Sequence, residues 1–96
     1  MMVIVSYDVS TTDAKGKARL RKVARICQNY GQRVNNSVFE IEADYRTILD
    51  VKQSLLQQIN EATDSLRFYY LGNSWKKRVE HFGANEPYDP QGVLIV

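Results

Sequence analysis

Apolar and polar residues follow two different periods along the chain, one typical of strands and one of helices. The chain opens with an apolar, β-branched run at residues 2–5, which ends in Tyr7 and Asp8 and precedes turn-forming residues at 10–13. A short apolar run bounded in this way predicts a strand buried on both faces. We expect Asp8 at the carboxyl end of a central strand, where a rigid scaffold holds side chains that still reach solvent. Capping of the next helix is the alternative role for Asp8.

A first helix is predicted from about residue 14 to residue 30. Apolar residues recur there at intervals of three and four, Thr12 or Asp13 can cap its start, and Gly31 is expected to end it in a left-handed conformation. Cys27 lies on the apolar stripe, so we interpret it as a core residue rather than a nucleophile. Because it is the only cysteine, no internal disulfide and no cysteine-based zinc site can form.

The stretch at 32–42 has strand character, but its apolar phase slips halfway along. A break or bulge near Asn35 and Asn36 accounts for the slip and predicts two short strands or one bent strand. A second helix is predicted at about 45–60, with Asp44 as its cap and an exposed side that carries mostly amides. We interpret this helix as structural.

Strand periodicity returns at 65–71, and a further short strand is predicted at 77–82. An apolar run at 93–96 closes the sequence, and we expect it to pair with a strand of its own chain or of a second protomer. The order of elements predicts an α+β fold: a ferredoxin-like split βαβ sandwich with an antiparallel sheet, two helices on one face and a C-terminal strand extension. The other sheet face would be bare in a monomer, which predicts a homodimer.

The length of 96 residues corresponds to one domain. We predict a single ferredoxin-like domain at 1–96, with a core at about 1–82 and a dimer-forming C-terminal extension at about 83–96. No apolar stretch approaches the roughly 20 residues of a membrane span, and the opening run is too short for a signal peptide. We therefore expect a cytoplasmic protein with no membrane partner.

Positive charge is concentrated in one part of the sequence. The formal net charge is only +2, but no acidic residue lies between Asp13 and Glu40. The basic residues in that interval are Lys15, Lys17, Arg19, Arg21, Lys22, Arg25 and Arg33. A solvated helix face usually mixes both signs, so an all-basic face favours phosphate contacts and predicts binding of nucleic acid. A second basic cluster lies at 76–78.

Several segments together resemble one known family along nearly the whole chain. They are the strand end at 7–9, the basic helix segment at 17–23, the turn and strand at 31–34 and 37–40, and the strand at 65–69 followed by a Leu-Gly pair at 71–72. This combination resembles Cas2, a family of small CRISPR-associated proteins, and the ending from Val79 onward is similar to the type I-C branch. At Asn35 and Asn36 the sequence departs from the family, which often has a glutamine and an aromatic or other side chain there.

The resemblance implies a ferredoxin-like homodimer that works with the Cas1 integrase in the acquisition of new spacers. In some members it also implies a divalent-metal-dependent nuclease that cuts RNA or double-stranded DNA. The family's metal-binding aspartate falls on Asp8, and Tyr7 lies beside it in the implied catalytic site. Further positions that the resemblance associates with activity, structure or the interface are Arg19, Arg33, Ser37 and Phe39.

Hydrolysis of a phosphodiester requires charge stabilisation and an activated water, and Mg²⁺, or Mn²⁺ in its place, supplies both. Mg²⁺ asks for only one or two carboxylates beside waters and phosphate oxygens. One Asp8 is too little, but a twofold axis can place two copies against one ion, with basic residues of the first helix on the phosphate. His81 has no partners at the spacing of a catalytic triad, so we interpret it as structural.

Two functions of different class stay open at this point. The first is a Mg²⁺-dependent endonuclease with Asp8 as the metal ligand. The second is a non-catalytic scaffold that holds duplex DNA and docks two integrase units. An RNA-cleaving toxin of the same fold is a more remote alternative. Replacement of Asp8 separates the first two, because only the nuclease needs this carboxylate for cleavage.

Overall fold

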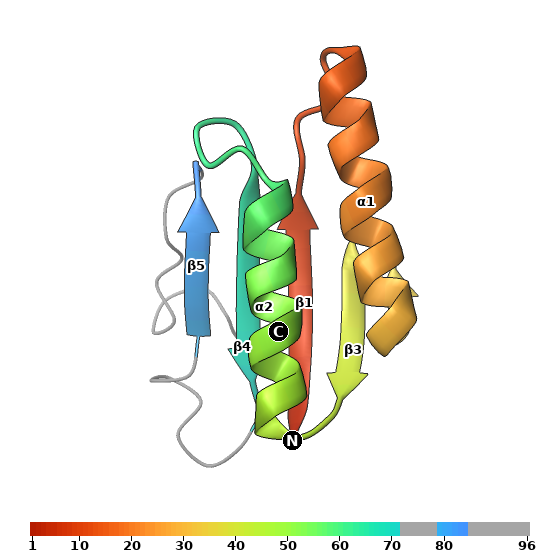
Figure 1. The fold of residues 1–96 in the computed structure, drawn as a ribbon, viewed down its shortest axis with the longest axis vertical. Coiled ribbons are helices and arrows are strands. Elements are labelled where there is room, and N and C mark those ends of the chain that lie inside the picture. Colours follow the sequence, from red (N-terminus) through yellow and green to blue (C-terminus); the bar gives the residue numbers. More distant parts are fainter. Residues whose placement is uncertain (72–78, 85–96) are drawn as a thin grey trace.

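The computed structural model describes residues 1–71 and 79–84, which form two helices and five strands (Figure 1). In chain order these are β1 (Met2–Asp8), α1 (Ala14–Tyr30), β2 (Gln32–Asn35), β3 (Val38–Glu42), α2 (Tyr45–Gln58), β4 (Ser65–Tyr70) and β5 (Val79–Gly83). The strands form one sheet in the order β2-β3-β1-β4-β5, and every neighbouring pair is antiparallel. The predicted α+β ferredoxin-like fold is confirmed.

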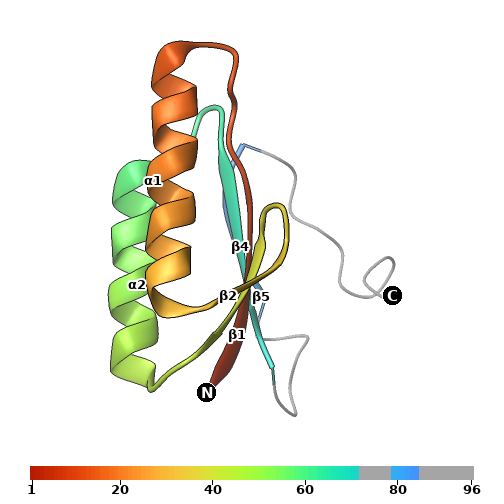
Figure 2. The same ribbon diagram turned by 90° about the vertical axis from the view of Figure 1, so that its right-hand side faces the viewer.

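Both helices cover the same face of the sheet (Figure 2), as predicted. The central strand β1 buries Val3 and Val5 beneath the helices, whereas Met2, Ile4 and Ser6, which alternate with them, are only half-buried. The prediction that this strand is buried on both faces is therefore wrong for the single chain. Its physical reason is that the helices cover one face only, and we call the other face, away from the helices, the open face.

Residues 32–42 form two strands, which was one of the two predicted alternatives. The β2–β3 pairing shifts register between Arg33 and Asn35, so the break predicted near Asn35 is confirmed. A shift of one residue moves every following side chain to the other face of the strand. The shift therefore explains why the apolar phase slips in the sequence.

The helix starts follow the prediction, but the end of α1 does not. Asp13 Oδ1 accepts a hydrogen bond from the backbone N–H of Gly16 at 2.8 Å, and Asp44 Oδ1 accepts one from a backbone N–H three residues later, also at 2.8 Å. Gly31 was expected to be left-handed but is extended, with φ −150°. It provides space instead, because a Cβ there would lie 2.2 Å from the carbonyl oxygen of Glu40.

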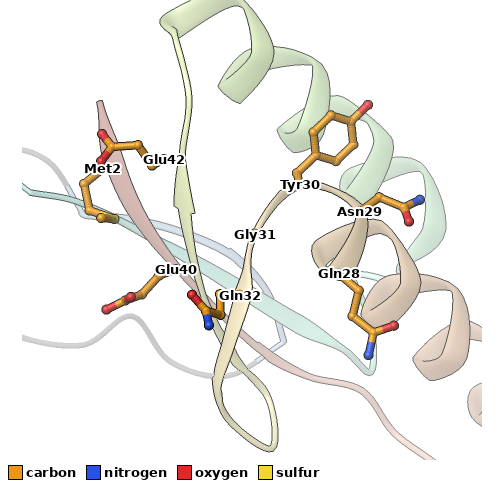
Figure 3. Close-up of a pocket in the computed structure, with 8 residues that line it drawn as sticks. All are labelled: Met2, Gln28, Asn29, Tyr30, Gly31, Gln32, Glu40 and Glu42. Atoms are coloured by element: carbon orange, nitrogen blue, oxygen red, sulfur yellow. The ribbon is translucent and has the colours of Figure 1, made fainter.

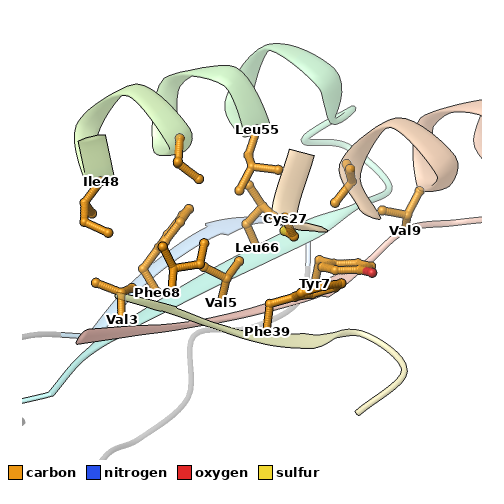
Figure 4. Packing of buried hydrophobic residues seen from close by; sticks show 13 residues of the cluster. Val3, Val5, Tyr7, Val9, Cys27, Phe39, Ile48, Leu55, Leu66 and Phe68 are labelled. Carbon is orange, nitrogen blue, oxygen red and sulfur yellow. The ribbon is translucent and has the colours of Figure 1, made fainter. Parts of the chain in front are cut away.

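A hydrophobic core fills the space between the helices and the sheet (Figure 4). Its buried members are Val3, Val5, Tyr7, Val9, Val23, Cys27, Phe39, Ile41, Ile48, Val51, Leu55, Leu66 and Phe68. Phe39 and Phe68 are among its largest fully buried side chains. Burial of one such side chain stabilises the fold by about 1.5–3 kcal/mol, so this cluster fixes the position of β1.

The strand predicted at 77–82 is present as β5, which pairs with β4 along its whole length. The apolar run at 93–96, most of the predicted C-terminal extension and the basic cluster at 76–78 lie outside the described residues. Neither helix of the described part has the length and hydrophobicity needed to span a membrane.

Candidate functional site

Asp8 stands exposed at the carboxyl end of β1. Its neighbours Tyr7 and Val9 are buried in the core, with exposed fractions of 4% and 7%. Asp8 lies opposite Ser65 in the β1–β4 ladder, and the alternation of the strand places it on the open face. The predicted position is confirmed. The alternative role as helix cap belongs to Asp13, so Asp8 combines a fixed backbone with a carboxylate that reaches solvent.

Asp8 is the exposed carboxylate at this end of the sheet that could serve as a cation ligand. Within residues 1–71 and 79–84, no three histidine, cysteine or acidic side chains come together in a way that could hold a metal ion. A Mg²⁺ ion keeps several waters and needs only one or two carboxylates, so the chemistry of a carboxylate at this position suits it. Asp8 is the residue that would hold the ion.

A buried ionic network, which the sequence did not reveal, lies next to Asp8. Asp64 has an exposed fraction of 0% and precedes Ser65, the residue opposite Asp8. Its Oδ2 accepts from Arg19 Nε at 2.8 Å, and its Oδ1 accepts from Arg19 Nη2 at 3.3 Å and from the backbone N–H of Ser10 at 3.0 Å. The carboxylate therefore joins α1 to the loop that follows Asp8.

Two further donors come from the turn before β4. The backbone N–H of Asn60 donates to Asp64 Oδ2 at 2.9 Å, and the hydroxyl of Thr63 donates to Oδ1 at 3.1 Å. Burial, the largest single influence, raises the pKa of Asp64, but the hydrogen bonds from Arg19, Asn60, Ser10 and Thr63 together hold that pKa below its ordinary value. The Asp64 carboxylate is therefore ionised, and both of its oxygens accept hydrogen bonds.

The structure places Arg19 apart from the other basic residues of α1. Its side chain is 21% exposed and ion-paired with Asp64, which raises the pKa of the guanidinium. The exposed basic residues of the same helix are Lys15, Lys17, Arg21, Lys22 and Arg25. Positions 17, 21 and 25 follow one another at intervals of four and form one row along the helix. We call Lys17, Arg21, Lys22 and Arg25 the basic ridge.

Tyr7 belongs to the core rather than to the surface beside Asp8. Its ring stacks on Phe39, with centroids 6.1 Å apart, and its hydroxyl donates to the carbonyl oxygen of Asn36 at 3.4 Å. Burial raises the pKa of the Tyr7 phenol. Its ring therefore packs within its own chain, and its hydroxyl points to the β2–β3 turn.

Arg33, Ser37 and Phe39 meet Tyr7 at that turn. The guanidinium of Arg33 lies 4.8 Å from the centroid of the Phe39 ring and also donates to the carbonyl of Asn36. The carbonyl of Ser37 accepts from the backbone N–H of Tyr7 at 3.1 Å. These contacts give Phe39, Ser37 and Arg33 a structural role in holding the hairpin against β1.

Cys27 and His81, which the sequence analysis interpreted as structural residues, both have contacts within the fold. Cys27 is fully buried, and burial raises the pKa of its thiol to about 12. His81 Nδ1 accepts a hydrogen bond from Arg67 Nε at 2.9 Å, so one ring nitrogen is already used within the sheet. The interpretation of Cys27 as a core residue is confirmed.

A hollow of about 460 Å³ lies at the opposite end of β1 (Figure 3). It is bordered by the last turn of α1, including Gln28, and by Met2, Glu40 and Glu42 of the sheet. Met2 and Asp8 are the two ends of β1, and six residue steps in a strand span about 20 Å. The hollow is therefore separate from the Asp8 end.

Comparisons with known proteins identify the family. The model of the family described as CRISPR associated protein Cas2 matches residues 1–79. The chain belongs to the Cas2 family. The resemblance stated from the sequence is thus confirmed, whereas the type I-C branch stays a prediction because the names of the relatives carry no subtype.

Curated Cas2 relatives match the chain along its full length. It is 50% identical over 96 residues to the CRISPR-associated endoribonuclease Cas2 of Chlorobaculum tepidum, with 100% of both chains covered. It is 50% identical over 95 residues to the CRISPR-associated endonuclease Cas2 of Halalkalibacterium halodurans, with 99% of each covered. The crystal structure of Streptococcus pyogenes Cas2 at pH 6.5 matches with a TM-score of 0.70 and 54% identity, over 83% of this chain and 96% of that chain.

Proposed function

We propose that this Cas2 protein is a homodimeric, divalent-metal-dependent endonuclease of spacer acquisition, with Asp8 as the metal ligand in each chain. The observation that carries the proposal is the exposed Asp8 carboxylate on an anchored strand end, in a chain that matches Cas2 relatives named endoribonuclease or endonuclease throughout. The substrate is RNA or double-stranded DNA, the ion is Mg²⁺ or Mn²⁺, and the protein partner is the Cas1 integrase.

The open face of the sheet supports the homodimer. It carries apolar residues from neighbouring strands, among them Ile4 of β1 and, directly opposite it, Tyr69 of β4. Polar residues such as Ser6 and Arg67 lie on the same face. A mixed face of this kind suits an interface between two copies, and an isologous contact sets each residue near its own mate. We therefore place the two Asp8 carboxylates near the twofold axis.

Asp8 would hold the cation, which when bound stabilises negative charge on the phosphate and supplies an activated water. In the hydrolysis, the water oxygen joins the phosphorus, the P–O bond to the leaving oxygen breaks, and the leaving oxygen takes up a proton. The basic ridge begins near the Asp8 end of the sheet, because only residues 9–13 separate β1 from α1. The buried residues Val23 and Cys27 turn the ridge away from the sheet, whereas Asp8 lies on the open face, so the ridge would hold a part of the phosphate backbone other than the reacting centre.

Replacement of Asp8 tests the proposal. Purified Asp8→Asn protein should fold as the wild type does, because the side chain is exposed, and should lose Mg²⁺-dependent cleavage of both RNA and duplex DNA. Asp50→Asn is the matched control, since Asp50 is another exposed carboxylate, paired with Arg46 one helical turn away. Cleavage by Asp8→Asn at the wild-type rate, under conditions where Asp50→Asn is also active, would remove Asp8 from the chemistry.

A non-catalytic scaffold is the second candidate, and the basic ridge favours it. The ridge supplies positive charge without any acidic neighbour on α1, which suits a surface that holds duplex DNA for the integrase. Under this alternative, Asp8→Asn leaves DNA binding and integration unchanged, whereas loss of the ridge weakens both. An integration assay with purified Cas1 and each variant distinguishes the two functions.

A further inference from the structure

Asp64 connects the segments that surround the end of β1. Its side chain accepts from the loop after Asp8 and from α1, through Ser10 and Arg19. Its backbone oxygen accepts from the N–H of Ala84, directly after β5, at 2.9 Å. The next residue, Ser65, pairs with Asp8. Asp64 therefore touches the neighbours of Asp8 along the chain and across the sheet.

The Ser10 peptide is held from two sides. Its N–H donates to Asp64 Oδ1 at 3.0 Å. Its carbonyl oxygen lies against the first turn of α1, where a Cβ added to Gly16 would stand only 2.0 Å away. The loop can pack this closely only because residue 16 has no side chain. Val9, which directly precedes Ser10, is buried in the core. The backbone on the carboxyl side of Asp8 is thereby fixed.

We propose that Asp64 and its partner Arg19 are positioning residues for Asp8. The inference rests on the proposed function, in which Asp8 is the cation ligand. Asp64 accepts from Ser10, two residues after Asp8, and directly precedes Ser65, which lies opposite Asp8 in the ladder, so the buried pair anchors the backbone on both sides of Asp8. Groups behind a metal ligand that fix its orientation govern the affinity of the site.

Charge supports the same assignment. The Asp64 carboxylate is fully buried, and the Arg19 guanidinium neutralises it through two hydrogen bonds. A pair that only stabilised the fold could sit anywhere in the core, whereas this one lies at the end of the sheet that carries Asp8. Because Arg19 is used here, its substitution should act on the cation site even when no nucleic acid is present.

Cation binding by the intact protein tests this assignment without relying on cleavage. The affinity for Mn²⁺ is measured by electron paramagnetic resonance for wild type, Asp8→Asn, Asp64→Asn and Arg19→Lys, each at a temperature where circular dichroism shows it folded. Arg19→Lys keeps the positive charge but loses the two guanidinium donors to Asp64. This variant tests the positioning role even if Asp64→Asn does not fold. Asp44→Ala is the control, because it removes a helix cap near the opposite end of β1.

The expected result is loss of Mn²⁺ binding in Asp8→Asn, an affinity weakened about tenfold or more in Asp64→Asn and Arg19→Lys, and wild-type affinity in Asp44→Ala. One outcome overturns the positioning role alone: Arg19→Lys, and Asp64→Asn where it folds, bind Mn²⁺ with wild-type affinity, whereas Asp8→Asn does not bind. The proposed function then stands. If Asp8→Asn itself binds normally, the cation site is not at Asp8, and both the proposed function and the positioning role fail.

Discussion

Arg19 and Asp64 are 45 residues apart in the sequence, yet their side chains meet at 2.8 Å beneath the surface. The pair joins the first helix to the turn before β4 and holds the loop after Asp8 in place. Removal of one member of a buried ion pair leaves the other charge without compensation, which is strongly destabilising. The stability of the whole end of the sheet therefore depends on the protonation state of Asp64.

The pH dependence of unfolding reports on this carboxylate. Its pKa is lower in the folded than in the unfolded chain, so its stabilisation is fully present above its ordinary pKa of about 4 and is lost as the pH falls further. Asp64→Ala removes hydrogen bonds to a charged group and should lower the free energy of unfolding by about 1.5–3 kcal/mol at pH 7, and by progressively less below pH 4. Urea unfolding at a series of pH values measures this difference. A difference that stays constant from pH 7 to pH 2 would contradict the role of the charge.

The basic ridge is tested by the salt dependence of duplex binding. Each phosphate contact contributes about 0.9 to the slope of log affinity against log salt concentration. Arg25→Gln should reduce the slope by about that amount, and the triple replacement of Arg21, Lys22 and Arg25 by about three times as much. Arg46→Gln is the matched control on α2, where the guanidinium is 84% exposed and paired with Asp50. If Arg25→Gln keeps the wild-type slope of log affinity against log salt concentration, as Arg46→Gln is expected to do, the ridge is excluded from the interface.

Cys27 should be inert in the folded protein. Burial raises the pKa of its thiol to about 12, so the reactive thiolate is essentially absent at pH 8. We expect no reaction with Ellman's reagent in native buffer and one thiol per chain in urea. Rapid modification of the native protein would show that α1 opens readily and that the core is less well packed than described.

Tyr7 should matter for stability rather than for cleavage. Tyr7→Phe keeps the ring stacked on Phe39 and removes only the hydrogen bond to Asn36, which costs at most about 1.5 kcal/mol. Cleavage of RNA and duplex DNA should stay within about threefold of wild type, a difference of about 0.7 kcal/mol in the activation free energy. A loss of 100-fold or more in a folded Tyr7→Phe protein would instead assign the hydroxyl to the chemistry.

Much of this fold follows from local sequence patterns. Apolar periodicity predicted both helices. Asp44 was predicted as one cap and Thr12 or Asp13 as the other, of which the structure has Asp13, and the phase slip near Asn35 and Asn36 predicted the register shift. Each of these signals lies within a few residues of the feature it specifies, which is why a single sequence contains it. The exposed strand end at Asp8 was predicted for the same reason.

The parts that were missed depend on residues far apart in the chain. Asp64 looks like an ordinary turn residue, because its partners at positions 10 and 19 are distant in the sequence and share no local pattern with it. Arg19 appeared to be one more member of a basic run for the same reason. The extended conformation of Gly31 is set by the close approach of β3, which only the folded chain brings near.

The central claim, that two Asp8 carboxylates share one cation, is tested most directly in a mixed dimer. Coexpression of differently tagged wild-type and Asp8→Asn chains allows purification of the dimer that carries a single Asp8, and its Mn²⁺ affinity and Mg²⁺-dependent cleavage are then compared with both parent dimers. A shared ion predicts that the mixed dimer behaves like the Asp8→Asn dimer in both measurements. Half of the wild-type sites and half of the wild-type activity in the mixed dimer would show that each chain binds its ion alone.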